Sequence, residues 1–189
     1  MIGTHVVQKA LKQQEPTTPL TRTTCIDSRR DETLPKIISL FSGAGGLDLG
    51  FQQAGFPLSF AADISTAAVQ THRRNFRKTL AVVADLTELG PDGVLSYLEP
   101  LLSDGERIGV IGGPPCQGFS RGNTQSTTED PRNQLPLLYL QIVEALQEKY
   151  TVEFVLFENV LGIRDSKHLT TFNGILEKFS DIGLTANAE

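Results

Sequence analysis

A lone cysteine in a rigid loop is the first residue whose type and position could do chemistry. Cys116 follows the segment 112–115 (Gly-Gly-Pro-Pro) and precedes 117–120 (Gln-Gly-Phe-Ser), directly after the apolar run 108–111. The run is typical of a buried strand, and the glycines and prolines fix the loop that follows it. At the carboxyl end of such a strand, a cysteine can be an activated nucleophile. A small buried residue in a tight turn is the alternative, and the segment alone favours neither.

A glutamate and an asparagine follow another apolar run. Glu158 and Asn159 come directly after residues 154–157 (Phe-Val-Leu-Phe). Burial at such a position raises the pKa of a carboxyl group and can keep it protonated as a donor. A glutamate that caps the next segment is the alternative. Because one crossover helix joins the two strands that precede Cys116 and Glu158, we expect both residues to share a cleft.

A glycine-rich turn lies near the start of the regular pattern. Residues 41–46 (Phe-Ser-Gly-Ala-Gly-Gly) separate an apolar run from a helical pattern. Such glycines let a ligand approach the backbone, and the helix that follows offers free N–H groups. Asp48 stands where the dinucleotide pattern G-x-G-x-x-G has its third glycine. The turn therefore disfavours a nicotinamide enzyme and leaves a related nucleoside ligand open.

Aspartates end the next two predicted strands. Asp63 lies 20 residues after Gly43, where a Rossmann-type fold places the carboxylate that accepts hydrogen bonds from ribose hydroxyls. Asp85 ends the following strand and could accept a hydrogen bond from an exocyclic amine. Alone, each could be a helix cap or a turn residue. Together, beside a glycine-rich turn, they outline a purine nucleoside site.

The elements that must position these residues alternate between strand and helix from residue 36 onward, which predicts an α/β fold with a parallel sheet. Strands are expected at 37–41, 58–63, 80–84, 108–111 and 154–157, and helices at 47–54, 65–75, 92–102, 135–149 and 169–179. Ser65 is expected to cap the second helix. Residues 1–34 are polar and predicted to form a mobile extension, with a short helix around 6–13. A further strand is expected to begin near residue 184.

Composition limits the possible functions. The length of 189 residues is typical of a single domain. The composition, with 39% hydrophobic and 21% charged residues, is typical of a soluble globular protein. Two cysteines and the lack of a signal-like or membrane-spanning apolar run favour a reducing, cytoplasmic location. His5, His72 and His168 have no companions at metal-ligand spacing, so no metal is expected.

The charge pattern argues against a complete nucleic-acid-binding surface. The net charge is −5, whereas a self-sufficient DNA-binding domain is usually basic. The one dense basic cluster, residues 72–78, is interpreted as the solvated end of a helix. If the substrate is nucleic acid, much of the surface that binds it is expected to lie outside this chain.

Taken together, these segments resemble the C5-cytosine DNA methyltransferases of the bacterial type. Five motifs stand in the family's order between residues 37 and about 165. They are the turn 41–46, Asp63, Asp85, Pro115-Cys116-Gln117 and Glu158-Asn159-Val160. The resemblance implies a Rossmann-like methyltransferase fold with helices on both faces of the sheet, S-adenosylmethionine as cofactor and double-stranded DNA as substrate. A cytoplasmic location in the bacterial cytosol or nucleoid would fit.

The resemblance also implies which residues bind the cofactor. They would be Phe41, Gly43, Gly45, Gly46, Asp63, Ile64, Asp85, Leu86 and Leu135, and residues 130–135 resemble a motif that helps line the cofactor pocket. Two positions depart from the family's pattern. Asp63 stands where glutamate is commoner, and Ile64 stands where an aromatic residue is common, so stacking on adenine would be weaker or made differently.

The implied mechanism uses a cytosine that has left the duplex. Cys116, preceded by Pro115, would add to C6, Glu158 would donate to N3, and Asn159 would help hold the loop and the base. C5 would then accept the cofactor's methyl group, after which the C5 proton and the cysteine would leave. The residues expected near DNA are Gln117, Ser120 and Arg121.

Relatives normally continue with an arginine-rich motif, a target-recognition region and a late segment that completes the cofactor site. None of these occurs in the 189 residues. Residues 35–189 are therefore expected to hold a truncated cofactor-binding and catalytic domain. Three alternatives remain open: a non-catalytic cofactor-binding fragment, one subunit of a split methyltransferase whose second chain supplies the missing motifs, and an RNA cytosine-5 methyltransferase.

Overall fold

The computed structural model describes residues 3–8, 34–115, 134–159 and 169–187. These residues form a seven-stranded sheet in the order β4-β3-β2-β5-β6-β1-β7. Five strands run parallel: β2 (Lys36–Leu40), β3 (Leu58–Asp63), β4 (Leu80–Val83), β5 (Arg107–Gly112) and β6 (Thr151–Asn159). The parallel strands confirm the predicted α/β class.

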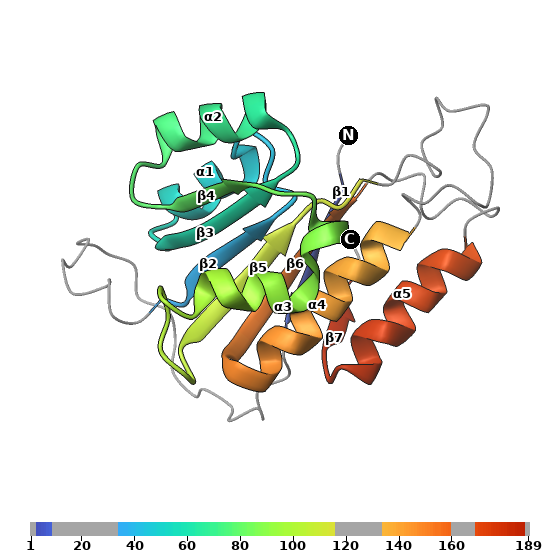
Figure 1. Cartoon of the computed structure of the whole chain (residues 1–189). Coiled ribbons are helices and arrows are strands. Elements are labelled where there is room, and N and C mark those ends of the chain that lie inside the picture. Colours follow the sequence, from blue (N-terminus) through green and yellow to red (C-terminus); the bar gives the residue numbers. More distant parts are fainter. Residues whose placement is uncertain (1–2, 9–33, 116–133, 160–168, 188–189) are drawn as a thin grey trace, which may run out of the picture.

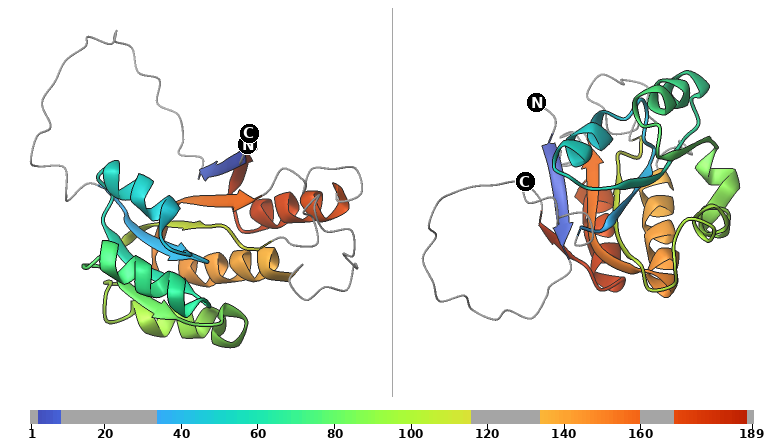
Figure 2. Two further views of the ribbon diagram at one scale, coloured as in Figure 1. Left: turned by 90° about the horizontal axis from the view of Figure 1, so that it is seen from above. Right: turned by 90° about the vertical axis from the view of Figure 1, so that its left-hand side faces the viewer.

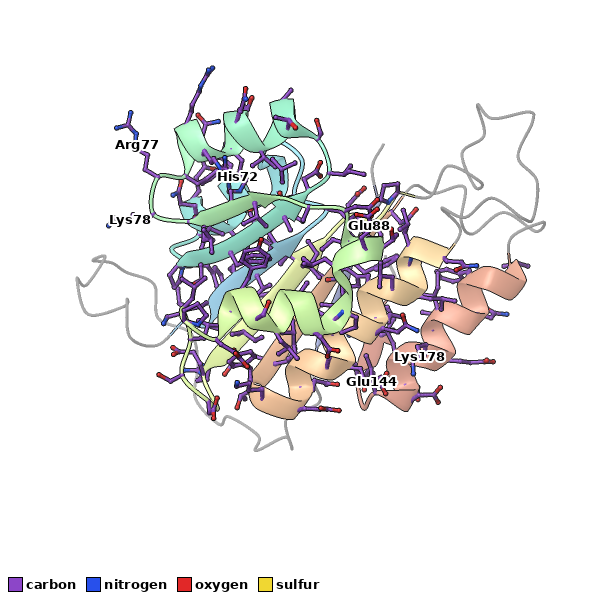
Figure 3. All side chains as sticks on the ribbon, in the orientation of Figure 1. His72, Arg77, Lys78, Glu88, Glu144 and Lys178 are labelled. Atoms are coloured by element: carbon purple, nitrogen blue, oxygen red, sulfur yellow. The ribbon has the colours of Figure 1, made fainter. Side chains whose placement is uncertain are left out.

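Helices cover both faces of this sheet (Figure 1, Figure 2). On one face lie α1 (Gly46–Gln53) and α2 (Thr66–Asn75), and on the other lie α3 (Leu86–Leu98), α4 (Leu135–Lys149) and α5 (Leu169–Asp181). The larger core cluster packs α3, α4 and α5 onto the sheet, and a smaller one packs α1 and the end of α2. Because the central strands are buried on both sides, they read as continuous apolar runs rather than alternating ones. Lys178 of α5 also pairs with Glu144 of α4 at 3.1 Å (Figure 3).

Two side chains at strand ends start the next helices. Ser65 Oγ accepts a hydrogen bond from Ala68 N at 3.3 Å, which confirms the predicted cap of α2. Asp85 caps α3 by accepting from the backbone N–H of Thr87 at 2.9 Å. The cap lets α3 begin at Leu86, before the predicted start at 92. Gly90 interrupts the helix with φ 62° and ψ −177°, and Pro91 starts its second segment.

The first residues differ from the prediction. Gly3–Gln8 form strand β1, so the expected helix is wrong over residues 6–8. β1 runs antiparallel to β6 and to β7 (Thr185–Asn187), and Figure 2 shows it beside these C-terminal strands. Thr4, Val6 and Val7 are β-branched, which favours a strand once the edge of β6 is available for pairing. Residues 9–33, where the rest of the predicted extension falls, lie outside the described ranges.

Two other expectations concern the last strand and membrane-spanning segments. The strand predicted near residue 184 is confirmed by β7. Within the described ranges, no helix is both long and apolar enough to cross a membrane.

Candidate active site

The carboxyl ends of β2, β5 and β6 enclose a cavity of about 420 Å³. The glycine-rich turn forms one wall, the end of β5 another, and Glu158 of β6 completes it. The lining residues are Ser39, Phe41, Ser42, Gly46, Leu47, Asp48, Gly112, Gly113 and Glu158. The cavity therefore brings the predicted cofactor turn together with the predicted glutamate, although they are more than a hundred residues apart in sequence.

The glycine-rich turn has an unusual backbone. Phe41 has φ 54°, and Gly43 has φ 55°, so two residues adopt the left-handed region within three positions. For a non-glycine residue this conformation costs on the order of 1–3 kcal/mol and tends to occur at functional sites. A Cβ atom added at Gly43 or Gly46 would meet nothing within 4 Å, so the space beside the turn is open.

The turn also presents polar groups without protein partners. Ser42 Oγ is buried and has no hydrogen-bond partner among the described residues. Helix α1 begins without a side-chain cap. Its first N–H groups are therefore available to a ligand, as at other anion-binding helix N-termini.

Asp63 supports the turn from the end of β3. Its Oδ2 accepts from Gly43 N, and its Oδ1 accepts from Ser65 N, both at 2.8 Å. Each carboxylate oxygen keeps a second lone pair that could accept from a ligand. Beside it, the side chain of Ile64 is 66% exposed, which leaves a large apolar group uncovered next to the turn.

Of the predicted cofactor residues, only Phe41 and Gly46 line the cavity; those that do not are Gly43, Gly45, Asp63, Ile64, Asp85, Leu86 and Leu135. The Asp85 carboxylate bonds to the Thr87 backbone and hydroxyl, and these hydrogen bonds lower its pKa. Leu86 is buried in the larger core cluster, and Leu135 begins α4. Within the structure, Asp85 is the cap of α3, which is one of the two roles that its sequence position allowed.

Glu158 and Asn159 lie beside the segment that leads to Cys116. Burial raises the pKa of the half-buried Glu158 carboxyl above its usual range. A Cβ atom at Gly113 would lie only 2.7 Å from Glu158 Oε2, so a larger residue there would displace the end of the Glu158 side chain. Asn159 Nδ2 donates to the Pro114 carbonyl at 3.3 Å. Pro115 is exposed at the end of the described range, and Cys116, Gln117, Ser120 and Arg121 lie outside it.

Sequence reasoning missed a buried polar cluster behind the turn. The Asp48 carboxylate accepts from Ser39 Oγ at 2.9 Å and lies 3.0 Å from His72 Nε2. Asp48 and His72 are 0% exposed. The one sequence signal for this cluster was the position of His72 on the same helix face as Val69 and Phe76. Because that face is apolar and becomes buried, a histidine on it needs a buried hydrogen-bond partner.

A second missed residue is Tyr139 of α4. Its hydroxyl lies 3.2 Å from the Val110 carbonyl and 3.1 Å from the Leu156 carbonyl, so it ties α4 to β5 and β6 near their carboxyl ends. Burial raises its pKa well above the usual value. Tyr139 lies in the helix that was predicted over 135–149, but its position there gave no sign that its hydroxyl would be buried.

The basic cluster is divided between core and solvent. His72 and Phe76 point into the core, whereas Arg77 and Lys78 are exposed and extend outward from the end of α2 (Figure 3). The exposed part agrees with the interpretation of this cluster as the solvated end of a helix.

The C-5 cytosine-specific DNA methylase family pattern matches residues 35–188. The Type II methyltransferase M.XorII of Xanthomonas oryzae pv. oryzae is 40% identical over 153 residues, which cover 80% of this chain and 34% of that protein. M.FnuDI of Fusobacterium nucleatum is 36% identical over 148 residues, which cover 78% and 39%. A solved protein assigned as a DNA modification methyltransferase, encoded within an E. coli prophage, has TM-score 0.64 and 36% identity, covering 78% and 38%. The chain thus spans between a third and two fifths of the length of these relatives.

Proposed function

Because this chain belongs to the C-5 cytosine-specific DNA methylase family, we propose that it carries the cofactor-binding and catalytic residues of a DNA cytosine-5 methyltransferase. The observation that supports this most directly is the cavity that the glycine-rich turn shares with Glu158. A methyl donor and a target base must meet in one place, and this cavity has a ligand-accessible backbone on one side and a carboxyl group on the other.

The cavity suits S-adenosylmethionine. The free space beside Gly43 and Gly46, the unpartnered Ser42 hydroxyl and the uncapped start of α1 would hold its polar methionine end. Asp63, with its remaining lone pairs, would accept from ribose hydroxyls, and the exposed Ile64 would contact the adenine. Phe41 and Gly45 would shape the turn that holds the cofactor. Cofactor contacts outside the cavity are proposed for Asp85, Leu86 and Leu135. When bound, this cofactor supplies an electrophilic methyl group on a sulfonium.

Glu158 is proposed to act on the base as a proton donor. Its raised pKa favours the protonated form that can donate to N3 of cytosine. Donation there would offset the negative charge that develops on the ring when a nucleophile adds to C6. Asn159, through its bond to Pro114, would keep the loop before Cys116 at a fixed distance from Glu158.

Cys116 is proposed as the nucleophile. Its thiolate would add to C6 of a flipped-out cytosine, which makes C5 able to accept a methyl group. Loss of the C5 proton and elimination of the thiolate would then restore the ring and release 5-methylcytosine. Pro115 would fix the backbone before the nucleophile, and Gln117, Ser120 and Arg121 would contact the DNA. One subunit of a split enzyme, with the remaining motifs on a second chain, stays the alternative, because the chain covers only 34% and 39% of these relatives.

The experiment is transfer of labelled methyl groups from S-adenosylmethionine to DNA of mixed sequence and, separately, to transfer RNA. We expect incorporation into DNA that is lost in Cys116→Ser and strongly reduced in Glu158→Gln. The matched control is Cys25→Ser, which removes the chain's other thiol.

Other outcomes separate the alternatives. Incorporation into transfer RNA alone would replace DNA by RNA as the substrate. Cofactor binding without transfer to either would favour a non-catalytic fragment or a subunit that needs its partner. Transfer that survives in Cys116→Ser would contradict the proposed nucleophile.

A further inference from the structure

Asp48 carries a buried carboxylate in the wall of the cavity. It lies in the first turn of α1, where the helix dipole stabilises a negative charge. Ser39 Oγ donates to its Oδ2, and His72 Nε2 faces its Oδ1 at 3.0 Å. A buried carboxylate with two donors and a helix N-terminus has the partners that allow it to stay ionised.

His72 supports the charge of Asp48 without cancelling it. Because Nε2 faces a carboxylate oxygen, Nε2 is the nitrogen that carries a proton. The other ring nitrogen, Nδ1, is buried and has no hydrogen-bond partner among the described residues. A protonated ring would therefore bury an unpaired N–H donor, whereas the neutral ring leaves only an unpaired acceptor. The geometry thus favours a neutral imidazole that donates to a charged carboxylate.

The rest of the cavity wall does not balance this charge. Glu158 is the other ionisable side chain that lines the cavity, and no Lys or Arg of the described residues does so. A fixed negative charge in a site with low-dielectric walls raises the local potential for cations.

We propose that Asp48 makes this cavity discriminate between a positively charged cofactor and its neutral product. The inference rests on the proposed function, in which S-adenosylmethionine, a sulfonium, is converted into the thioether S-adenosylhomocysteine. The two ligands differ only in the methyl group and the positive charge on the sulfur, so a charge at Asp48 distinguishes them at that atom. Asp48 is accordingly assigned an electrostatic role, because its carboxylate is fully buried and both of its oxygens already have partners in Ser39 and His72.

The test is calorimetric titration of the full chain with each ligand, which needs no activity. In Asp48→Asn, which keeps the side-chain shape, the ratio of affinities for the sulfonium and the thioether should fall about threefold to tenfold, the size expected for one charge acting through a partly polar medium. The matched control is His72→Gln, whose amide nitrogen can replace Nε2 as the donor and which should leave the ratio unchanged. Equal weakening of both ligands in a folded Asp48→Asn variant would reduce Asp48 to a structural role and overturn the inference.

A second variant keeps the test decisive if Asp48→Asn does not fold. Replacing both Asp48 and His72 by leucine, together with Ser39→Ala, removes the charge without leaving either of its hydrogen-bond partners unpaired, a change that buried ion pairs often tolerate. The same fall in the ratio is expected, and an unchanged ratio would refute the electrostatic role. If the unsubstituted chain binds neither ligand, the proposed function fails and this inference fails with it.

Discussion

Replacing Gly45 by alanine should destabilise the fold far more than the same change at the neighbouring Gly46. Gly45 precedes α1 with φ 91°, and a Cβ atom there would lie 2.3 Å from Phe76 Cε2 and 2.9 Å from His72 Cδ2. Both rings belong to the buried end of α2, where they lie 4.4 Å apart between centroids. The His72 ring cannot move aside without disturbing its contact with Asp48, and the Phe76 ring packs against His72.

The expected magnitude follows from two separate costs. A left-handed conformation costs an alanine about 1–2 kcal/mol, and overpacking a buried contact costs about 1–3 kcal/mol. Together they predict a loss of about 2–5 kcal/mol, which for a chain of this size lowers Tm by on the order of 10 °C. At Gly46, a Cβ atom meets open space and φ is not positive, so alanine should be neutral or stabilise by up to about 1 kcal/mol.

Urea unfolding followed by circular dichroism would measure both variants against the unsubstituted chain. The comparison is matched, because both changes add one methyl group to the same turn. Equal stability of the two variants would refute the reasoning, since it would mean that Phe76 and His72 do not close against Gly45.

Two further predictions concern ionisable groups. Burial raises the pKa of Glu158 in the folded state above its ordinary value of 4.5. The folded chain therefore holds this proton more tightly than the unfolded chain, and the resulting stability is complete below pH 4.5. It is lost as the pH rises through the raised pKa. Glu158→Gln should therefore gain stability relative to the unsubstituted chain between acidic and neutral pH in urea titrations; a constant difference would argue against burial of the carboxyl. Tyr139→Phe should cost about 1 kcal/mol of unfolding free energy because it removes the hydroxyl donor to a buried carbonyl. Burial raises the pKa of Tyr139 well above the usual range. Tyr139→Phe should therefore also remove the step at the highest pH from a spectrophotometric titration of the tyrosines.

Much of the fold could be predicted because local signals agree with the tertiary structure. The five parallel strands are apolar runs bounded by glycine, proline or aspartate, and Ser65 starts α2 as its sequence position indicates. The first turn of α3 was missed because Pro91 resembles a helix start, while the true start depends on the Asp85 cap. Strand β1 was missed because it forms only by pairing with β6, which is distant in sequence.

The site residues that belong to local sequence motifs could be predicted, whereas those that depend on contacts in the folded structure could not. The glycine-rich turn and Glu158 were identified from their order along the chain, and their common cavity follows from parallel strands that end at one edge. The bond between Asp48 and His72 joins two helices 24 residues apart, so neither residue alone indicated the other. The left-handed Phe41 was likewise unpredictable, because only the surrounding structure holds a non-glycine residue there.

The most direct test of the account is covalent trapping of the chain with DNA that contains 5-fluorocytosine, in the presence of S-adenosylmethionine. Fluorine at C5 cannot leave as a proton does, so a cysteine that has added to C6 stays attached. We predict a denaturation-resistant complex whose attachment site maps to Cys116 by peptide mass spectrometry and which persists in Cys25→Ser. An adduct that attaches through Cys25, or one that still forms in Cys116→Ser, would contradict the catalytic role proposed for Cys116.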